Sequence, residues 1–306
     1  YKNVLDASYA ARTGGKTITM IADATLSGNN LATGSDHAFV LDGNNHTLTI
    51  GGVSFRSDGG TMTVKNLKVV TADDSSEGVI TSNGGVMTFE NCSFTATAKY
   101  NRAHGFVTSN TSAEASLTFK NCNFSIDANS KWAKEGTTFL HRYGSNNPVL
   151  NFEGTTLDLS NTVLPLSNSG NVILSVKDGS SIKTAKSIPS ANVTIADSAV
   201  EATAKDVNLF DYNGYGTVNI VAVNAKLTAK KYVFKFSGCK TAVNVTLDGN
   251  TVVNGTNRAF SVTNNTCPVT ITAKGTSEIR SDAGENNAIY VCGNNENASF
   301  TLTMMD

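Results

Sequence analysis

The fold of this chain is decided by a six-residue segment that recurs along its first half. It reads VKNLKV at Val64–Val69, FENCSF at Phe89–Phe94 and FKNCNF at Phe119–Phe124. Apolar residues occupy the first, fourth and sixth places, and asparagine occupies the third. A repeat of about 25 residues indicates that the core is built by stacking one unit on the next.

The asparagine of this segment marks a sharp corner in the backbone. Side chains two apart in a strand share a face, but the first and fourth apolar places lie three apart. A residue at positive φ produces such a break, and Asn, Asp and Gly tolerate it. Looser copies of the segment carry Gly154, Asp197 and Gly249 at this position. The sequence therefore predicts a stacked column of corners at Asn66, Asn91, Asn121 and their equivalents.

Each unit has a second recognisable half, a short apolar strand that ends in Gly or Asn. Examples are Gly78–Asn83, His104–Asn110, Ala259–Asn264 and Ala288–Gly293. Two or three such strands cannot bury their inner face alone, whereas stacked copies form parallel sheets around one apolar column. This predicts an all-β solenoid of about eleven coils in a single domain, residues 1–306. An antiparallel sandwich is the alternative, and it would show frequent two-residue hairpin turns.

The two ends of the chain differ from the repeats. Residues 3–12 predict a short helix with Leu5 and Tyr9 on one face and the small Ser8 beside them. Such a helix would cap the column, so residues 1–26 are interpreted as the cap and first strand. No equivalent pattern closes the other end, where Phe300–Asp306 reads as a strand. We expect the native polypeptide to continue, and the missing initiator Met indicates a mature or excised fragment.

Composition excludes several classes of function. The 306 residues are 40% hydrophobic and 16% charged, with a net charge of −1. We therefore expect no nucleic-acid partner, because no basic excess is available. No apolar run approaches the ~20 residues that span a bilayer, so no membrane insertion is expected. The spacing of the five cysteines does not suggest zinc. Cys92 and Cys122 occupy the same inward place, which permits either a disulfide or two buried thiols.

These features together resemble the right-handed parallel β-helix of the pectin-lyase-like superfamily, whose asparagine ladder Asn66, Asn91 and Asn121 match. Residues 11–26 (ARTGGKTITMIADATL) and 39–50 (FVLDGNNHTLTI) resemble the start of pectate-lyase-like adhesive domains of bacterial surface proteins. The resemblance implies a right-handed coil and an extracellular location on a bacterial cell. It does not transfer an activity, because one fold hosts unrelated functions.

The enzymes of that superfamily carry signatures that this chain lacks. Polygalacturonase-like hydrolases have a Gly-His-Gly and an Arg-x-Lys, and neither occurs here. Pectate-lyase-like enzymes gather carboxylates for calcium. The compact acidic group here is Asp73, Asp74 and Glu77, which offers three oxygens of the six to eight that calcium takes. A solvated loop is the competing interpretation, and no resident cofactor is expected.

Three successive coils carry longer excursions, over residues 70–77, 95–104 and 125–137. Stacking would place these loops side by side, and long loops on a rigid scaffold are where sites form. Trp and Tyr beside charged groups suit a sugar or a protein partner. In the competing interpretation Trp132 covers a hydrophobic flank and the charges are solvated. The candidate ligand-binding residues are Tyr100, Arg102, His104, Lys131, Trp132, Lys134, His141, Arg142 and Tyr143.

The hypothesis that follows is a non-catalytic adhesion module on the exterior of a bacterial cell. It would present the loop cluster to a host protein or a glycan, as a monomeric part of a longer chain. The alternative is a polysaccharide lyase or glycoside hydrolase acting on an acidic polysaccharide. In that case a carboxylate, His104 or His141 would act with Lys131 or Arg142 in the groove lined by the loops.

Overall fold

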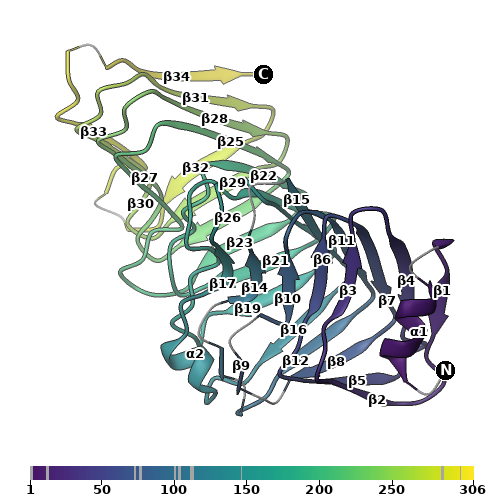
Figure 1. Cartoon of the computed structure of the whole chain (residues 1–306). Coiled ribbons are helices and arrows are strands. Elements are labelled where there is room, and N and C mark those ends of the chain that lie inside the picture. The colour runs from purple at the N-terminus through teal and green to yellow at the C-terminus, as the bar shows by residue number, and fades with distance from the viewer. Residues whose placement is uncertain are drawn as a thin grey trace. The chain divides into compact units, whose positions relative to one another are not determined.

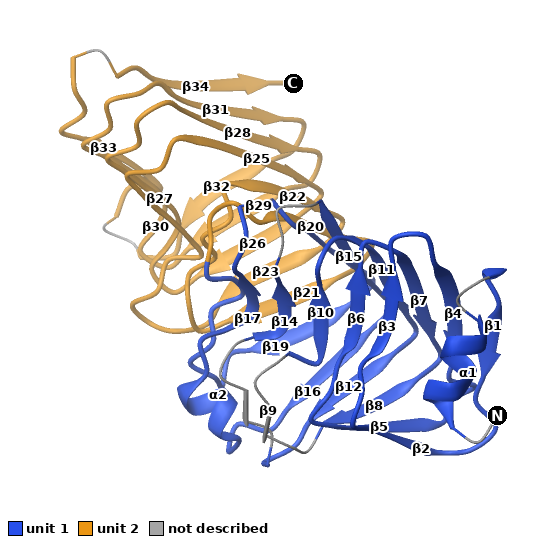
Figure 2. Cartoon of the chain, in the orientation of Figure 1, with its two compact units in different colours: residues 1–168 blue, residues 169–306 orange. Residues whose placement is uncertain are grey.

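The computed structural model describes residues 3–11, 14–71, 74–75, 78–99, 101–102, 105–110, 114–145, 147–283, 286–296 and 298–306, with residues 74–75 and 101–102 described by their backbone. It is a parallel β-solenoid of about 10 turns, consistent with a right-handed β-helix; the sequence predicts about eleven. The chain divides into two compact units, residues 1–168 and 169–306 (Figure 2). The single continuous domain over residues 1–306 stays a prediction.

Unit 1 has three main sheets, whose strands follow one another around each turn, and a two-stranded sheet of β9 (Asp74–Ser75) and β13 (Asn101–Arg102) (Figure 1). Sheet A1 contains β1 (Thr17–Thr19), β4 (Ala38–Asp42), β7 (Thr61–Lys65), β11 (Gly85–Glu90), β15 (Ala115–Lys120) and β18 (Val149–Glu153). Sheet B1 contains β2 (Ala24–Ser27), β5 (Thr47–Gly51), β8 (Lys68–Thr71), β12 (Ser93–Ala96), β16 (Asn123–Ile126) and β19 (Thr156–Leu159). Sheet C1 contains β3 (Leu31–Gly34), β6 (Phe55–Asp58), β10 (Ile80–Ser82), β14 (Gly105–Ser109) and β17 (Thr138–Arg142).

Unit 2 repeats this plan. Sheet A2 contains β20 (Ile173–Lys177), β22 (Asn192–Ala196), β25 (Thr217–Val223), β28 (Ala242–Asp248), β31 (Val269–Lys274) and β34 (Phe300–Met305). Sheet B2 contains β21 (Ser181–Thr184), β23 (Ala199–Ala202), β26 (Lys226–Ala229), β29 (Val252–Gly255) and β32 (Glu278–Ser281). Sheet C2 contains β24 (Phe210–Asn213), β27 (Tyr232–Ser237), β30 (Arg258–Thr263) and β33 (Ile289–Cys292). Neighbouring strands pair in parallel, which rules out the antiparallel sandwich.

The predicted corners join the A and B strands of each turn. Their φ angles are 52° at Asn66, 52° at Asn91, 50° at Asn121, 56° at Gly154, 49° at Asp197 and 62° at Gly249. Further corners that the segment pattern does not mark lie at Asn45, Asp178, Asn224 and Gly275, with φ between 48° and 63°. The prediction of a left-handed corner residue is therefore confirmed.

The corner side chains also form the predicted ladder. Asn121 Nδ2 donates to Asn91 Oδ1, and Asn91 Nδ2 donates to Asn66 Oδ1, each at 3.3 Å. Asn66 Nδ2 donates in turn to Asp42 Oδ1 at 3.1 Å. In unit 2, Asn224 Nδ2 donates to Asp197 Oδ1 at 3.0 Å. Each corner amide donates a hydrogen bond to the side chain of the neighbouring turn, so the hydrogen-bonded column is continuous through these turns.

The interior of each unit is a set of vertical rows of apolar side chains. One row of unit 1 is formed by Leu41, Val64, Phe89, Phe119 and Phe152, each 0% exposed. The rings of its last three residues stack with centroids 5.4 and 5.7 Å apart. Because strands in a sheet are about 4.8 Å apart, identical side chains in one row meet face to face and exclude water.

The helix α1 (Val4–Ala11) lies at the N-terminal end of unit 1, where it contacts β1, β2, β3 and β4 (Figure 1). The predicted cap is present, but the predicted face is wrong. Ala7, Ser8 and Ala11 are buried, whereas Tyr9 is 51% exposed. Small side chains allow the helix to approach the first turn closely, which a tyrosine at the interface would prevent. Neither described helix is long and apolar enough to cross a bilayer.

All five cysteines are free thiols. Cys92 and Cys122 lie buried in adjacent turns, and their Sγ atoms donate to backbone carbonyls of Glu90 at 3.3 Å and Phe89 at 3.4 Å. Of the two alternatives that the sequence leaves open, the structure has the buried thiols.

Candidate functional site

The three long loops that the sequence singles out lie side by side on unit 1. The first contributes β9 (Asp74–Ser75) and the second contributes β13 (Asn101–Arg102), and these short strands pair in parallel. The third carries α2 (Lys131–Glu135), which contacts β13. The predicted stacking of the loops is confirmed for the described part of each loop.

The short helix α2 holds Trp132 against the core. Ser130 caps the helix, since its Oγ accepts a hydrogen bond from the Ala133 N–H at 3.0 Å. Trp132 is 0% exposed, and its ring lies 5.9 Å from that of Phe106, between centroids. The indole therefore lies in the core, as in the competing interpretation that Trp132 covers a hydrophobic flank, and a ligand-binding role for it stays a prediction. The loop turns inward because burying an indole removes a large apolar area from water.

The other predicted site residues divide into three groups. Those with described side chains are Lys131 and Lys134, exposed on α2, and His141, Arg142 and Tyr143, at the end of β17. Those described by their backbone are Arg102 in β13 and Asp74 in β9. Those that lie outside the described residues are Tyr100, His104, Asp73 and Glu77.

A row of polar side chains crosses the outer face of sheet C1. The strand register places in line Arg56, Thr81, Thr108 and His141. Thr81 and Thr108, in the middle of the row, are 4% and 6% exposed. Their hydroxyl oxygens are buried and have no hydrogen-bond partner among the described residues. Other buried hydroxyl groups of the described chain, such as those of Ser175 and Ser190, are in the same state, so this feature is not particular to the row.

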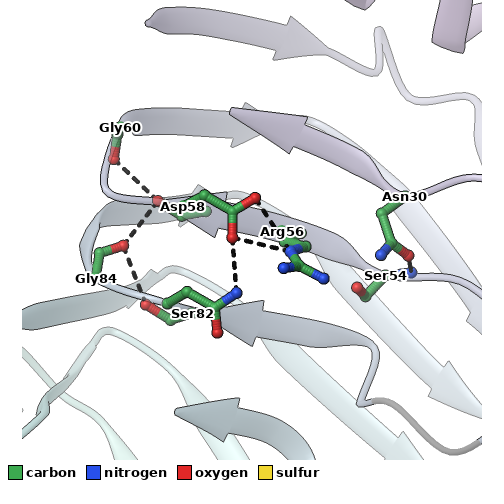
Figure 3. A network of polar contacts seen from close by, with 9 residues as sticks. Asn30, Ser54, Arg56, Asp58, Gly60, Ser82 and Gly84 are labelled. Carbon is green, nitrogen blue, oxygen red and sulfur yellow. Dashed lines mark hydrogen bonds and ion pairs between the residues drawn. The ribbon is translucent and has the colours of Figure 1, made fainter. Parts of the chain in front are cut away.

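Beside this row, Asp58 is held by side chains from two neighbouring strands (Figure 3). Arg56 Nε donates to its two carboxylate oxygens at 2.9 and 3.1 Å. Asn83 Nδ2 donates to Asp58 Oδ1 at 2.6 Å. The side chains of Arg56 and Asp58 are 32% and 42% exposed, so their pairing stabilises the fold by at most about 1 kcal/mol. Its structural effect is to fix two opposite charges on the surface.

Two serines fix the backbone under this network (Figure 3). The Ser57 hydroxyl lies within hydrogen-bond distance of the carbonyl oxygens of Gly60, at 3.0 Å, and Gly84, at 2.8 Å. The Ser82 hydroxyl donates to the Gly84 carbonyl oxygen at 3.4 Å. These bonds tie the ends of β6 and β10 to the turns that lead into sheet A1, so the charged pair stands on a rigid base.

The far end of the row presents two aromatic rings. The rings of His141 and Tyr143 lie 4.2 Å apart between centroids, tilted by 31°, and Tyr143 is 45% exposed. Desolvation raises the pKa of Tyr143, so its phenol is neutral at physiological pH. The Arg142 N–H donates to Asn168 Oδ1 at 2.8 Å, and Asn168 Nδ2 donates to the Arg142 carbonyl oxygen at 3.2 Å. This exchange fixes the end of β17 and with it the direction of both rings.

The face as a whole has the chemistry of a binding surface. We name it the C1 face, and it consists of Arg56, Asp58, Asn83, Thr81, Thr108, His141 and Tyr143. It combines fixed charges and exposed rings, which suit hydrogen bonding to and stacking on a polar ligand. Among the described residues, no three His, Cys, Asp or Glu side chains gather where they could hold a metal ion. Calcium at Asp73, Asp74 and Glu77 stays a prediction.

Sequence reasoning missed Arg56, Asp58 and Asn83. Arg56 and Asp58 precede the first loop, Asn83 lies between the first and second loops, and no local motif marks them. An alignment of β6 with β10 by the inward Phe55 and Ile80 would have placed Arg56 beside Thr81. That alignment was within reach of the sequence, because both strands end just before a turn that contains glycines.

Comparisons with known proteins give little beyond this geometry. No protein-family model matches the chain, and no curated protein matches it. One solved structure, described as "L. reuteri 53608 SRRP", is similar in fold. The alignment covers 100% of this chain and 99% of that one, with 14% sequence identity and a TM-score of 0.38. A similarity of that size carries no argument about function.

Proposed function

We propose that this chain is a non-catalytic binding module, exposed on the exterior of a bacterial cell, that presents the C1 face and the exposed lysines of α2 to a host protein or glycan. The proposal includes membership of the pectin-lyase-like superfamily, as the resemblance of the opening segments and the asparagine ladder suggests. The solenoid would act as a stiff support that keeps the C1 face in place.

One observation carries this proposal. The C1 face presents the rings of His141 and Tyr143, 4.2 Å apart between centroids, in line with Arg56 and its fixed partner Asp58. Sheet A1 of the same unit also has outward charges, paired at Lys65–Asp42 and Lys120–Glu90, but its outward positions contain no aromatic ring. Exposed rings beside a fixed ion pair are typical of a ligand-binding face.

The test is the joint substitution of His141→Ala and Tyr143→Ala. The protein is first screened on an array of glycans and on immobilised host extracellular proteins. We expect the double variant to bind the ligand found there about tenfold more weakly, because exposed aromatic rings commonly contribute the central contacts of an interface. Surface plasmon resonance measures the change.

Tyr9→Ala is the matched control, since Tyr9 is 51% exposed on α1, away from the C1 face. It should bind as tightly as the unchanged protein. If both variants lost affinity equally, or if the double variant kept its affinity, the binding site would not be the C1 face. Cleavage of an acidic polysaccharide by the unchanged protein would replace the proposal by the enzymatic alternative.

A further inference from the structure

The outer face of sheet B2 in unit 2 is hollowed into a groove of about 350 Å³. All five strands of the sheet line it. The register places in one line across them Lys183, Glu201, Thr228, Asn254 and Arg280. With strands about 4.8 Å apart, the line is roughly 19 Å long. We name this feature the B2 groove.

The B2 groove has an excess of positive charge. Its lining contains four cationic side chains, Lys183, Lys226, Lys230 and Arg280, against the two carboxylates of Glu201 and Asp282. Arg280 pairs with Glu278 at 3.1 Å. The three lysines make no ion pair among the described residues, although all three are exposed. The chain as a whole has a net charge of −1, so this concentration is local.

The solenoid does not need these charges. The equivalent outward row on sheet B1 of unit 1 consists of Thr25, Thr49, Val70, Thr95 and Ser125, and it continues on β19 with Asp158. The same structural positions therefore form the same parallel sheet without a cationic residue. Stacked ionic side chains also gain little in exposed sheet positions, so folding alone does not account for the difference between the two sheets.

The B2 groove continues into a second depression of about 330 Å³ at the corner of unit 2. The two share Ser181, Ala199 and Lys226. The corner adds the amide of Asn224, which donates to Asp197 Oδ1 at 3.0 Å, and the exposed amide of Asn250. Amides and hydroxyls of this kind exchange hydrogen bonds with a polyhydroxylated ligand. Neither lining contains an aromatic ring, so recognition there would be polar and ionic.

From this arrangement we infer that the B2 groove is a second binding site, specific for a linear polysaccharide that carries sulfate or carboxylate groups. The groove is open along its length and crosses several strands, which suits an extended polymer. Lys183 and Arg280 stand at the two ends of the line, and Lys226 and Lys230 flank its middle strand, β26, so the cations can meet successive anionic groups. Its hydroxyl and amide groups can meet the sugar hydroxyls between them.

The test is binding of heparin, polygalacturonate and neutral dextran to the full chain at low ionic strength, measured by isothermal titration calorimetry. We expect one or both anionic polymers to bind, dextran not to bind, and affinity to fall with added salt. Tighter binding of heparin would identify sulfate as the preferred anionic group, and tighter binding of polygalacturonate would identify carboxylate. The Lys183→Ala/Lys226→Ala variant should bind about tenfold more weakly, since two charge contacts are lost.

The control variant is Lys16→Ala/Lys68→Ala, which removes two exposed lysines from unit 1 and changes the net charge by the same amount. It should keep its affinity within about twofold. Equal weakening in both variants would show that only overall charge matters and would overturn the proposal. Absence of binding to both anionic polymers at low salt would overturn it as well. Circular dichroism of both variants confirms that the solenoid is intact.

Discussion

At the scale of single residues, the corner position explains why this chain can turn between sheets A and B without a long loop. The backbone there adopts a φ near +50°, where a Cβ atom normally costs about 1–2 kcal/mol. Asparagine offsets part of that cost because its amide joins the ladder, and glycine avoids it. The occurrence of Asn, Asp and Gly at equivalent corners follows from these two solutions.

Replacing Asn91 by alanine is expected to lower the free energy of unfolding by about 1–3 kcal/mol. Alanine would have to keep a φ of 52° and would lose the two ladder hydrogen bonds to Asn66 and Asn121. Urea denaturation followed by circular dichroism measures the change.

Asn91→Gly separates the two contributions, because glycine accepts the same φ but has no amide. We expect it to cost less than about 1 kcal/mol. If alanine and glycine proved equally stable, the backbone conformation would not be what selects asparagine at this corner.

At the scale of elements, α2 shows how a loop becomes part of the core. The helix has only five residues, too few to be stable on its own. Its cap at Ser130 and the burial of Trp132 hold it in place. The third loop is therefore a fixed wall beside the C1 face, with Lys131 and Lys134 on its exposed side.

Trp132→Ala should destabilise unit 1 by about 3–5 kcal/mol, because it leaves a large cavity against Phe106. Lys131→Ala, one residue away and exposed, should change stability by less than about 0.5 kcal/mol. Urea denaturation of both variants by circular dichroism makes the comparison. A Trp132→Ala protein as stable as the Lys131→Ala protein would contradict the core position of the indole.

At the scale of the whole molecule, the five thiols report on the integrity of the two cores. Cys92, Cys122, Cys239 and Cys267 are buried, whereas Cys292 is exposed. Burial raises the pKa of Cys239 to about 11 and also raises the pKa of Cys267. The hydrogen bond with Cys92, together with burial, raises the pKa of Cys122. Since thiolate is the reactive form, the folded state protects Cys122, Cys239 and Cys267 both by access and by ionisation, whereas it protects Cys92 by access alone.

With Ellman's reagent at pH 8, one thiol per chain should react at once and the others only after denaturation. At that pH a thiol of pKa 11 is thiolate in only about one molecule in a thousand. Cys292→Ser should abolish the fast reaction and leave the total after denaturation at four thiols. A second fast thiol in the native protein would show that one of the cores is open.

The sequence by itself determined the corners and the stacking, because these depend on local chemistry. A residue type that tolerates positive φ, with inward-facing apolar residues on both sides, predicts a corner wherever it occurs in the chain. The inward positions of Phe89 and Cys92 follow from that segment alone, and so does the ladder from Asn66 to Asn121.

Only the tertiary structure decided which outward side chains meet. The ladder asparagines are separated by 25 residues in one turn and 30 in the next, so the partner of an outward residue depends on every intervening loop length. For that reason Lys183 could not be placed in line with Arg280 from local pattern. The burial of Trp132 was undecided for the same reason, since an apolar residue in a long loop turns inward only if the neighbouring turn leaves room for it.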